Sequence, residues 1–247
     1  MQTHGLSELL LSFHNIMGMR FTQGSTQYVD TNYNYSGGAF TFECWFQAVD
    51  FEDICDVMAI DDNRHPTNDD TQAQVFVNTS GLVNFNVFAN CSGTTWNLAT
   101  TGAAAFTAGE WYYISAGWDA VNTLEISVLN NKGELMETVS TTGNTICASG
   151  ARELSVGIRT HFVAGGDRII RNAYFCDGSS PGGDNTVRAR ALSRIPIMNG
   201  IPHTTGTVRF FPMVDSSDTR ELVGTTATTL ANTPTSGDDP PALSFRY

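Results

Sequence analysis

From Met19 onward, apolar and polar residues alternate with a period of two in one short run after another. In residues 40–48, three phenylalanines, Cys44 and Ala48 occupy alternate positions, with Thr, Glu, Trp and Gln between them. Since successive side chains of a strand point to opposite faces, each run predicts a half-buried β-strand. The alternation recurs in residues 73–90, 123–140, 153–162, 167–175 and 206–214, with turn residues at 78–81 and 130–133. Roughly ten or more short strands separated by turns predict an all-β sandwich or barrel.

The composition suits one strand-rich domain. Of the 247 residues, 41% are hydrophobic and only 15% are charged. Asn, Thr, Ser and Gly fill the difference, which is typical of strands and turns. The formal net charge of −12 disfavours nucleic acid as a partner. No apolar run approaches the length of a membrane span, so we expect no membrane partner.

The two ends of the chain differ from the alternating middle. Leu6, Leu9, Leu10 and Phe13 follow a helical spacing, which predicts a short helix with one apolar stripe. Such a helix either packs on its own domain or docks on a neighbouring subunit. Near the C-terminus, a stretch poor in core residues carries two consecutive prolines and is predicted to be extended. We therefore predict a helical arm in residues 1–18, a sandwich in residues 19–222 and an extended arm in residues 223–247.

The stretch FTAGEWYYISAGWDA, residues 106–120, concentrates aromatic side chains on one predicted strand. It either lines a binding cleft or lies at the centre of a core. Tyr112, Ile114, Ala116 and Trp118 fall on one face, while Trp111 opens the other face. This pattern favours the core. We expect Phe42, Phe46, Tyr112, Ile114, Trp118 and Val128 to be buried between two sheets.

The order of the strands from about residue 19 to about residue 175 resembles the laminin-G-like, concanavalin A-type jelly-roll family. Gly109 and Trp111 match its Gly-x-Trp strand start, Asp119 its Asp at the strand end, and Asn131-Lys132-Gly133 its hairpin turn. The resemblance implies a two-sheet antiparallel jelly roll. It implies little about function, because lectins, glycosidases, adhesion modules and virus structural proteins share this fold. The tail, with a Phe-Pro pair at 211–212 and GDDPP at 237–241, resembles the ends of laminin-G-like proteins of bacteriophages.

Catalytic residues are not evident, and we expect no enzyme activity. Glycosidases of this family place Glu-x-Asp-x-x-Glu on one strand, but residues 50–58 offer only Glu52 and Asp56 on a shared face. The five histidines are dispersed, with neither metal-ligand spacing nor a partner nucleophile.

Calcium is the cofactor that one polar loop suggests, although a solvated acidic turn is the alternative. Oxygen ligands from loops suit this ion, and the loop offers Asp61, Asp62, Asp69 and Asp70. A glycan site beside it would use Asn63, Asp69 and Trp96, which we predict to lie outside a strand. Capping one end of the core is the alternative role for Trp96.

The five cysteines are odd in number, and no pair has the C-x-x-C spacing of zinc or redox sites. We expect all five to be reduced thiols, as in a reducing cytoplasm. The first residues also lack the basic segment and cleavage site of a secretion signal.

These features favour a non-enzymatic virion structural protein, a bacteriophage head decoration (cement) or tail component assembled in the host cytoplasm. Its expected partners are further copies in a homo-oligomer and other virion proteins such as the major capsid protein. The assembly contacts would come from the two arms, through Leu6, Leu9, Leu10, Phe13, Phe245 and Tyr247. The alternative is a carbohydrate-binding adhesin or receptor-binding module of the same fold, with a glycan as its partner.

Overall fold

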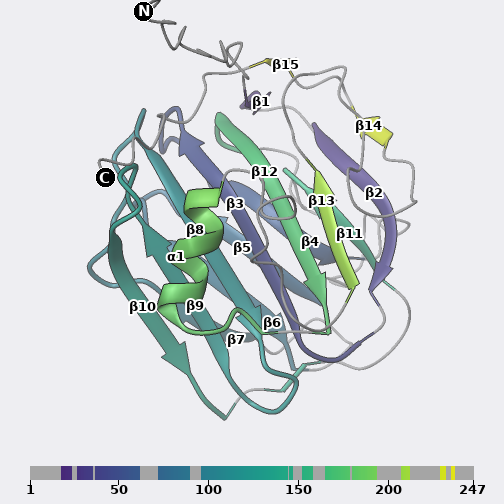
Figure 1. The fold of residues 1–247 in the computed structure, drawn as a ribbon. Helices are drawn as coiled ribbons and strands as arrows, with labels where there is room; N and C mark the ends of the chain where they lie inside the picture. The colour runs from purple at the N-terminus through teal and green to yellow at the C-terminus, as the bar shows by residue number, and fades with distance from the viewer. Residues whose placement is uncertain are drawn as a thin grey trace, which may run out of the picture.

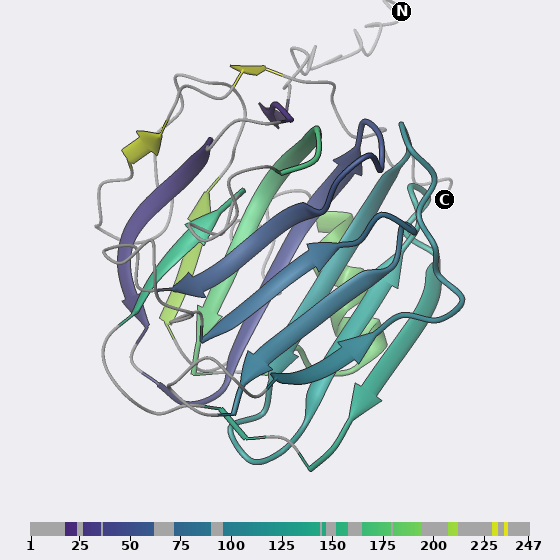
Figure 2. The same ribbon diagram turned by 180° about the vertical axis from the view of Figure 1, so that it is seen from behind.

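A computed structural model describes residues 18–23, 27–35, 37–61, 72–89, 96–143, 145–146, 152–157, 165–178, 180–193, 207–211, 229–231 and 235–236. These residues form two antiparallel sheets, sheet A and sheet B, which pack face to face (Figure 1). Figure 2 shows the sandwich from behind, with sheet B toward the viewer. The two-sheet antiparallel jelly roll that the sequence predicts is confirmed.

Sheet A has the strand order β10-β9-β8-β3-β12-β1-β15, and β13 pairs with β12 beside β1. Its strands are β1 (Met19–Phe21), β3 (Phe40–Ala48), β8 (Trp111–Trp118), β9 (Leu124–Leu129), β10 (Leu135–Thr141), β12 (Arg168–Asp177), β13 (Thr207–Phe211) and β15 (Thr235–Ser236). The predicted turn at 130–133 joins β9 to β10.

Sheet B has the strand order β14-β2-β11-β4-β5-β6-β7. Its strands are β2 (Tyr28–Tyr35), β4 (Cys55–Asp61), β5 (Ala73–Val77), β6 (Val83–Phe88), β7 (Trp96–Thr100), β11 (Arg152–Val156) and β14 (Thr229–Ala231). The predicted turn at 78–81 joins β5 to β6. Trp96 begins β7, so the prediction that it lies outside a strand is wrong. The sequence hid this strand because its five residues, Trp-Asn-Leu-Ala-Thr, do not alternate strictly between apolar and polar.

The main core lies between the two sheets. The six residues predicted to be buried there all belong to it: Phe42, Phe46, Tyr112, Ile114, Trp118 and Val128. Cys44 packs in the same cluster, as its phase in the alternation predicts. Full burial of one such side chain contributes about 1.5–3 kcal/mol to stability. The aromatic side chains of the strand at 111–118 therefore pack in the core rather than in a binding cleft.

The helix α1 (Asp184–Ser193) packs on the outer face of sheet A (Figure 1). The sequence of this long connection is compatible with one helical turn, and the structure shows a helix of ten residues there. Val187 and Ala191, four positions apart, present a small apolar surface to the sheet. The rest of the helix has no apolar stripe, which is why its periodicity gave no signal.

The predicted arms lie mostly outside the described residues. Leu6, Leu9, Leu10 and Phe13 belong to the undescribed part, as do Phe245 and Tyr247. Two short pieces of the C-terminal segment are described, and they do not support the predicted extended arm. They add strands to the sandwich, because β14 pairs with β2 in sheet B and β15 pairs with β1 in sheet A.

Three cysteines are described, Cys44, Cys55 and Cys176, and each is a buried free thiol. Burial raises the pKa of the Cys55 thiol to about 12, which leaves it protonated and unreactive near neutral pH. Cys91 and Cys147 lie outside the described residues, so full reduction of the five thiols stays a prediction. Within the described part of the chain, no helix is both long and apolar enough to cross a membrane.

Candidate functional site

The outer face of sheet A changes in character along its strands. At one end, Trp45, Trp111, Tyr113, Leu129 and Ile169 form a second apolar cluster, which α1 covers with Val187 and Ala191. Trp45 and Tyr113 meet edge to face, with ring centroids 5.4 Å apart. The aromatics of β8 are thus buried on both sides of the sheet. This end of the face is structural.

A row of polar side chains crosses the middle of this face. By strand register Glu43 lies beside Ser115, Ser115 beside Ser127, and Ser127 beside Thr138. The fully buried Glu43 carboxylate accepts hydrogen bonds from Tyr113 (2.8 Å) and Ser115 (2.7 Å). At the far end of the row, the Thr138 hydroxyl donates to Asp184 in the first turn of α1, at 2.8 Å. The row ties the helix to the sheet.

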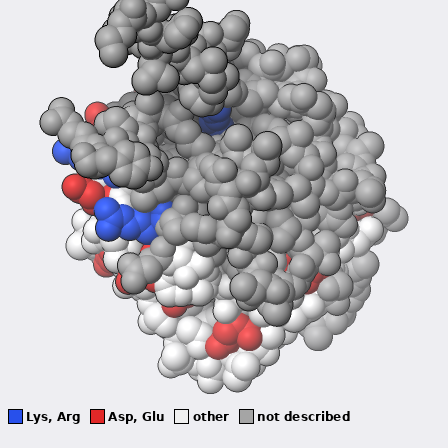
Figure 3. All heavy atoms as spheres, viewed as in Figure 1, with Lys and Arg blue, Asp and Glu red and all other residues white. Residues whose placement is uncertain are grey.

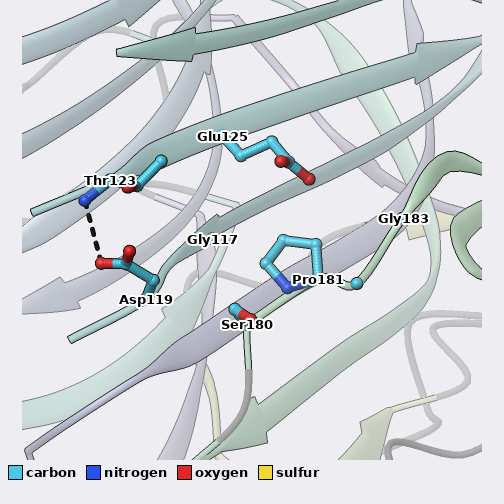
Figure 4. Close-up of a pocket in the computed structure, with 8 residues that line it drawn as sticks. Gly117, Asp119, Thr123, Glu125, Ser180, Pro181 and Gly183 are labelled. Carbon is cyan, nitrogen blue, oxygen red and sulfur yellow. Dashed lines mark hydrogen bonds between the residues drawn. The ribbon is translucent and has the colours of Figure 1, made fainter. Parts of the chain in front are cut away.

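Beyond this row the face opens into a pocket of about 280 Å³. The pocket is lined by Gly117, Asp119, Thr123, Glu125, Ser180, Pro181, Gly182 and Gly183 (Figure 4). The first four belong to the hairpin formed by β8 and β9, and the last four to the loop that leads from β12 into α1. A rigid sheet and a helix-bound loop therefore hold the two sides of the pocket.

Asp119 lies where β8 ends, at the Asp position of the family pattern. Its Oδ1 accepts hydrogen bonds from the backbone N–H groups of Val121 (2.8 Å), Asn122 (2.9 Å) and Thr123 (2.9 Å). Burial acts to raise the pKa of Asp119, but these hydrogen bonds outweigh burial and lower it. The carboxylate stays ionised and fixes the hairpin turn, which presents the neighbouring side chains to the pocket.

Glu125 projects from β9 on the outer face and is half-buried. By register it lies between Gly117 of β8 and Ser140 of β10. Burial raises its pKa, and the negative charge of Asp184 raises it further. In Figure 4 its carboxyl reaches toward the loop of Pro181 and Gly183. A carboxyl held near other acids, with its pKa raised, is more typical of a functional position than of a packing position.

The wall of the pocket depends on a close approach at Gly117. A Cβ atom added there would lie 2.6 Å from the Phe40 carbonyl oxygen and 2.6 Å from Cγ of Pro181. Only glycine lets the Pro181 ring lie against β8 in this way. Gly182 takes a φ of +81°, which turns the loop toward the start of α1.

The charge of the pocket is negative. Its described lining contains two carboxylates and neither lysine nor arginine. Figure 3 shows a compact group of acidic atoms on the lower part of the face seen in Figure 1, and no basic atoms of described residues lie beside it. In the part of the chain that the structure describes, no three His, Cys, Asp or Glu side chains are close enough together to hold a metal ion.

The structure does not test the sites predicted from the sequence. Asp62, Asn63, Asp69 and Asp70 lie outside the described residues. Asp61 ends β4 and Trp96 begins β7, but the positions of their side chains are not described. Glu52, considered as a catalytic acid, is exposed in a loop, whereas Asp56 is buried in β4. The predicted calcium and glycan sites on the 61–70 loop thus stay predictions.

Sequence reasoning missed Glu125 and the loop of residues 180–183 as site residues. Glu125 fits the alternation of β9 as an ordinary outward-facing residue. A weak signal was present, because the family pattern marks Asp119 only six positions earlier on the same hairpin. The contact between this hairpin and a loop about sixty residues away could not be read from local pattern.

Comparisons with known proteins describe the fold. No family model matches the chain, and no curated protein matches it. The CBM40 of the Ruminococcus gnavus IT-sialidase, bound to α2,3-sialyllactose, is 14% identical with a TM-score of 0.49, covering 71% of this chain and 98% of that chain. A native heptameric SAP-like pentraxin from Limulus polyphemus is 11% identical with a TM-score of 0.46, covering 88% and 96%.

Domains LG4-5 of the mouse laminin α1 chain are 16% identical with a TM-score of 0.47, covering 64% of this chain and 40% of that chain. The match spans less than half of the laminin structure. None of these three proteins is a bacteriophage protein. With such low identities and TM-scores, none of the likenesses carries an argument about what this chain binds.

Proposed function

We propose that the chain is a carbohydrate-binding module whose site is the pocket between the β8–β9 hairpin and residues 180–183. The lining of the pocket carries this proposal. Carboxyl and hydroxyl groups of Asp119, Thr123, Glu125 and Ser180 surround it, with the Pro181 ring beside them.

These groups match the chemistry of a sugar. The hydroxyls of a sugar donate hydrogen bonds that carboxylate oxygens accept, and they accept bonds from side-chain hydroxyls. The Pro181 ring offers an apolar surface to the C–H groups of a sugar ring. A volume of about 280 Å³ lies just below the usual range for ligand pockets, roughly 300–1,000 Å³, and suits a single sugar unit.

The proposal is tested by glycan-array binding and ligand-observed NMR on the full chain and on Glu125→Ala. The variant removes acceptor oxygens from the pocket, so we expect at least about tenfold weaker binding of the recognised glycan. Glu110→Ala is the matched control, because Glu110 is an exposed carboxyl at the opposite end of β8. An intact chain that binds no glycan, or two variants with equal effects, would contradict the proposal.

The virion role remains a separate proposal. It depends on the terminal segments and on the phage-like tail, whose residues lie mostly outside the described part of the chain. Its test is deletion of residues 1–17, which should leave a folded domain that no longer assembles. Normal assembly of the truncated chain, or its unfolding, would rule out a docking arm.

A further inference from the structure

We propose that the pocket selects sugars that carry a protonated amine over sugars that carry a carboxylate. This inference rests on the proposed function, because it names the ligand class of the same pocket. It follows from the charges around Glu125 and from the absence of a hydrogen bond to its carboxyl among the described residues.

Among the described residues, the charged groups that line the pocket with Glu125, or that shift its pKa, are acidic. Asp119 stands on the β8–β9 turn and lines the same pocket. Asp184, at the start of α1, is close enough to raise the pKa of Glu125 by its charge. The paired position on β10 is Ser140, and residues 180–183 bring no charge. A positive group that entered this pocket would be attracted by two or three carboxylates at once.

Glu125 is the carboxyl that is available for such a group. Asp119 is already engaged in the turn, through three backbone hydrogen bonds to Oδ1 and a further one from the Thr123 side chain, and it adds its charge. Glu125 differs from the other acids of sheet A, since the structure shows no hydrogen bond to it from any described residue. Ionising a half-buried carboxyl beside another acid costs free energy, and a bound ammonium group offsets that cost.

Acidic and neutral sugars gain less binding free energy in this pocket than amino sugars do. A uronic acid or another acidic sugar brings a negative charge toward Glu125 and Asp119 and is repelled. A neutral sugar makes hydrogen bonds but leaves the carboxylates without a counter-charge. We therefore expect the order of affinity to be amino sugar, then neutral sugar, then acidic sugar.

A pH dependence follows from the same contacts. A bound ammonium group favours ionised Glu125, so binding of an amino sugar is coupled to proton release. Its affinity should fall as the pH is lowered through the raised pKa of Glu125. A neutral sugar lacks this coupling.

The experiment measures dissociation constants by NMR titration at about pH 6, where primary amines are protonated. The probes are glucosamine, glucose and glucuronic acid, with the galactose series in parallel because the sugar stereochemistry is open. Ethanolamine tests whether an amine binds without a sugar. The variants are Glu125→Gln, which removes the charge but keeps one acceptor oxygen, and Glu110→Gln as the equal-charge control.

We expect one amino sugar to bind about three- to tenfold more tightly than its neutral counterpart, with the acidic sugar weakest. In Glu125→Gln the ratio between amino and neutral sugar should fall toward one, while Glu110→Gln keeps the wild-type ratio. Equal binding of all three sugar types would overturn the proposed selectivity but would still support carbohydrate binding. Binding of ethanolamine as tight as that of the amino sugar would overturn the proposal of a sugar ligand. If no sugar binds, the proposed function fails as well.

Discussion

Glu43 and Glu125 project from the same face of sheet A, on strands that flank β8, yet their surroundings are opposite. Glu43 is fully buried, and two hydroxyl groups donate to its two oxygens at 2.7 and 2.8 Å. Glu125 is half-buried beside Asp184, and no donor to it is found in the described part of the chain. A buried carboxylate with its hydrogen bonds made belongs to the architecture. For Glu125, whose described charged neighbours are acids, we propose that the partner is a ligand.

The largest effect should come from removing the buried carboxylate. Glu43→Ala removes the carboxylate that accepts the buried hydrogen bonds of Tyr113 and Ser115, and it opens a cavity. We expect a loss of about 2–4 kcal/mol in the free energy of unfolding, measured by urea denaturation. Glu43→Gln keeps one acceptor and should lose about 1 kcal/mol. If Glu43→Ala unfolds at the same urea concentration as the wild type, Glu43 is not structural.

Gly117→Ala should affect both stability and the pocket. The added Cβ meets the Phe40 carbonyl oxygen at 2.6 Å and cannot displace it without moving β3, so the Pro181 loop or the strand must shift. We expect a loss of about 1–3 kcal/mol together with weaker glycan binding. Gly102→Ala is the control, since its nearest contact would be Glu137 at 3.8 Å. An unchanged affinity in Gly117→Ala would show that this loop is not part of the site.

The smallest effect concerns the stability of Glu125→Gln. The pKa of Glu125 is raised in the folded protein, so its ionisation costs stability as the pH rises through that pKa. The variant should therefore melt at a slightly higher temperature than the wild type at neutral pH. Its advantage should vanish below the ordinary pKa of glutamate, where both side chains are neutral. Solvent screens this half-exposed group, so the gain should be small. A lower melting temperature at neutral pH would mean that Glu125 has a stabilising partner.

Much of the fold could be predicted from the sequence. The alternation of residues 40–48 and 111–118 identifies which side chains face the core, because strand geometry leaves only two faces to choose between. It does not say whether the opposite face meets solvent. Thr41, Glu43 and Trp45 are buried on that face, and among the described side chains of the helix packed over it, Val187 and Ala191 make the apolar contacts.

The candidate site was less predictable for a related reason. Asp119 could be marked from the end of its strand, but its pocket needs a loop from residues 180–183 that packs against Gly117. That contact depends on a missing Cβ atom and on tertiary packing, and neither of these produces a periodic pattern in the sequence. The sequence instead directed attention to the 61–70 loop and to Trp96, where acids and an aromatic are close along the chain.

The most direct test is a ¹H–¹⁵N NMR titration of the full chain with the best-bound sugar. We expect the largest shifts at the backbone amides of Gly117, Thr123, Glu125 and Gly182, with little change at Glu110 and Asn131 at the opposite end of the hairpin strands. Saturable shifts confined to the pocket residues would support the site. Shifts that cluster on sheet B, or that leave Glu125 and Gly182 unmoved while the sugar binds, would contradict it.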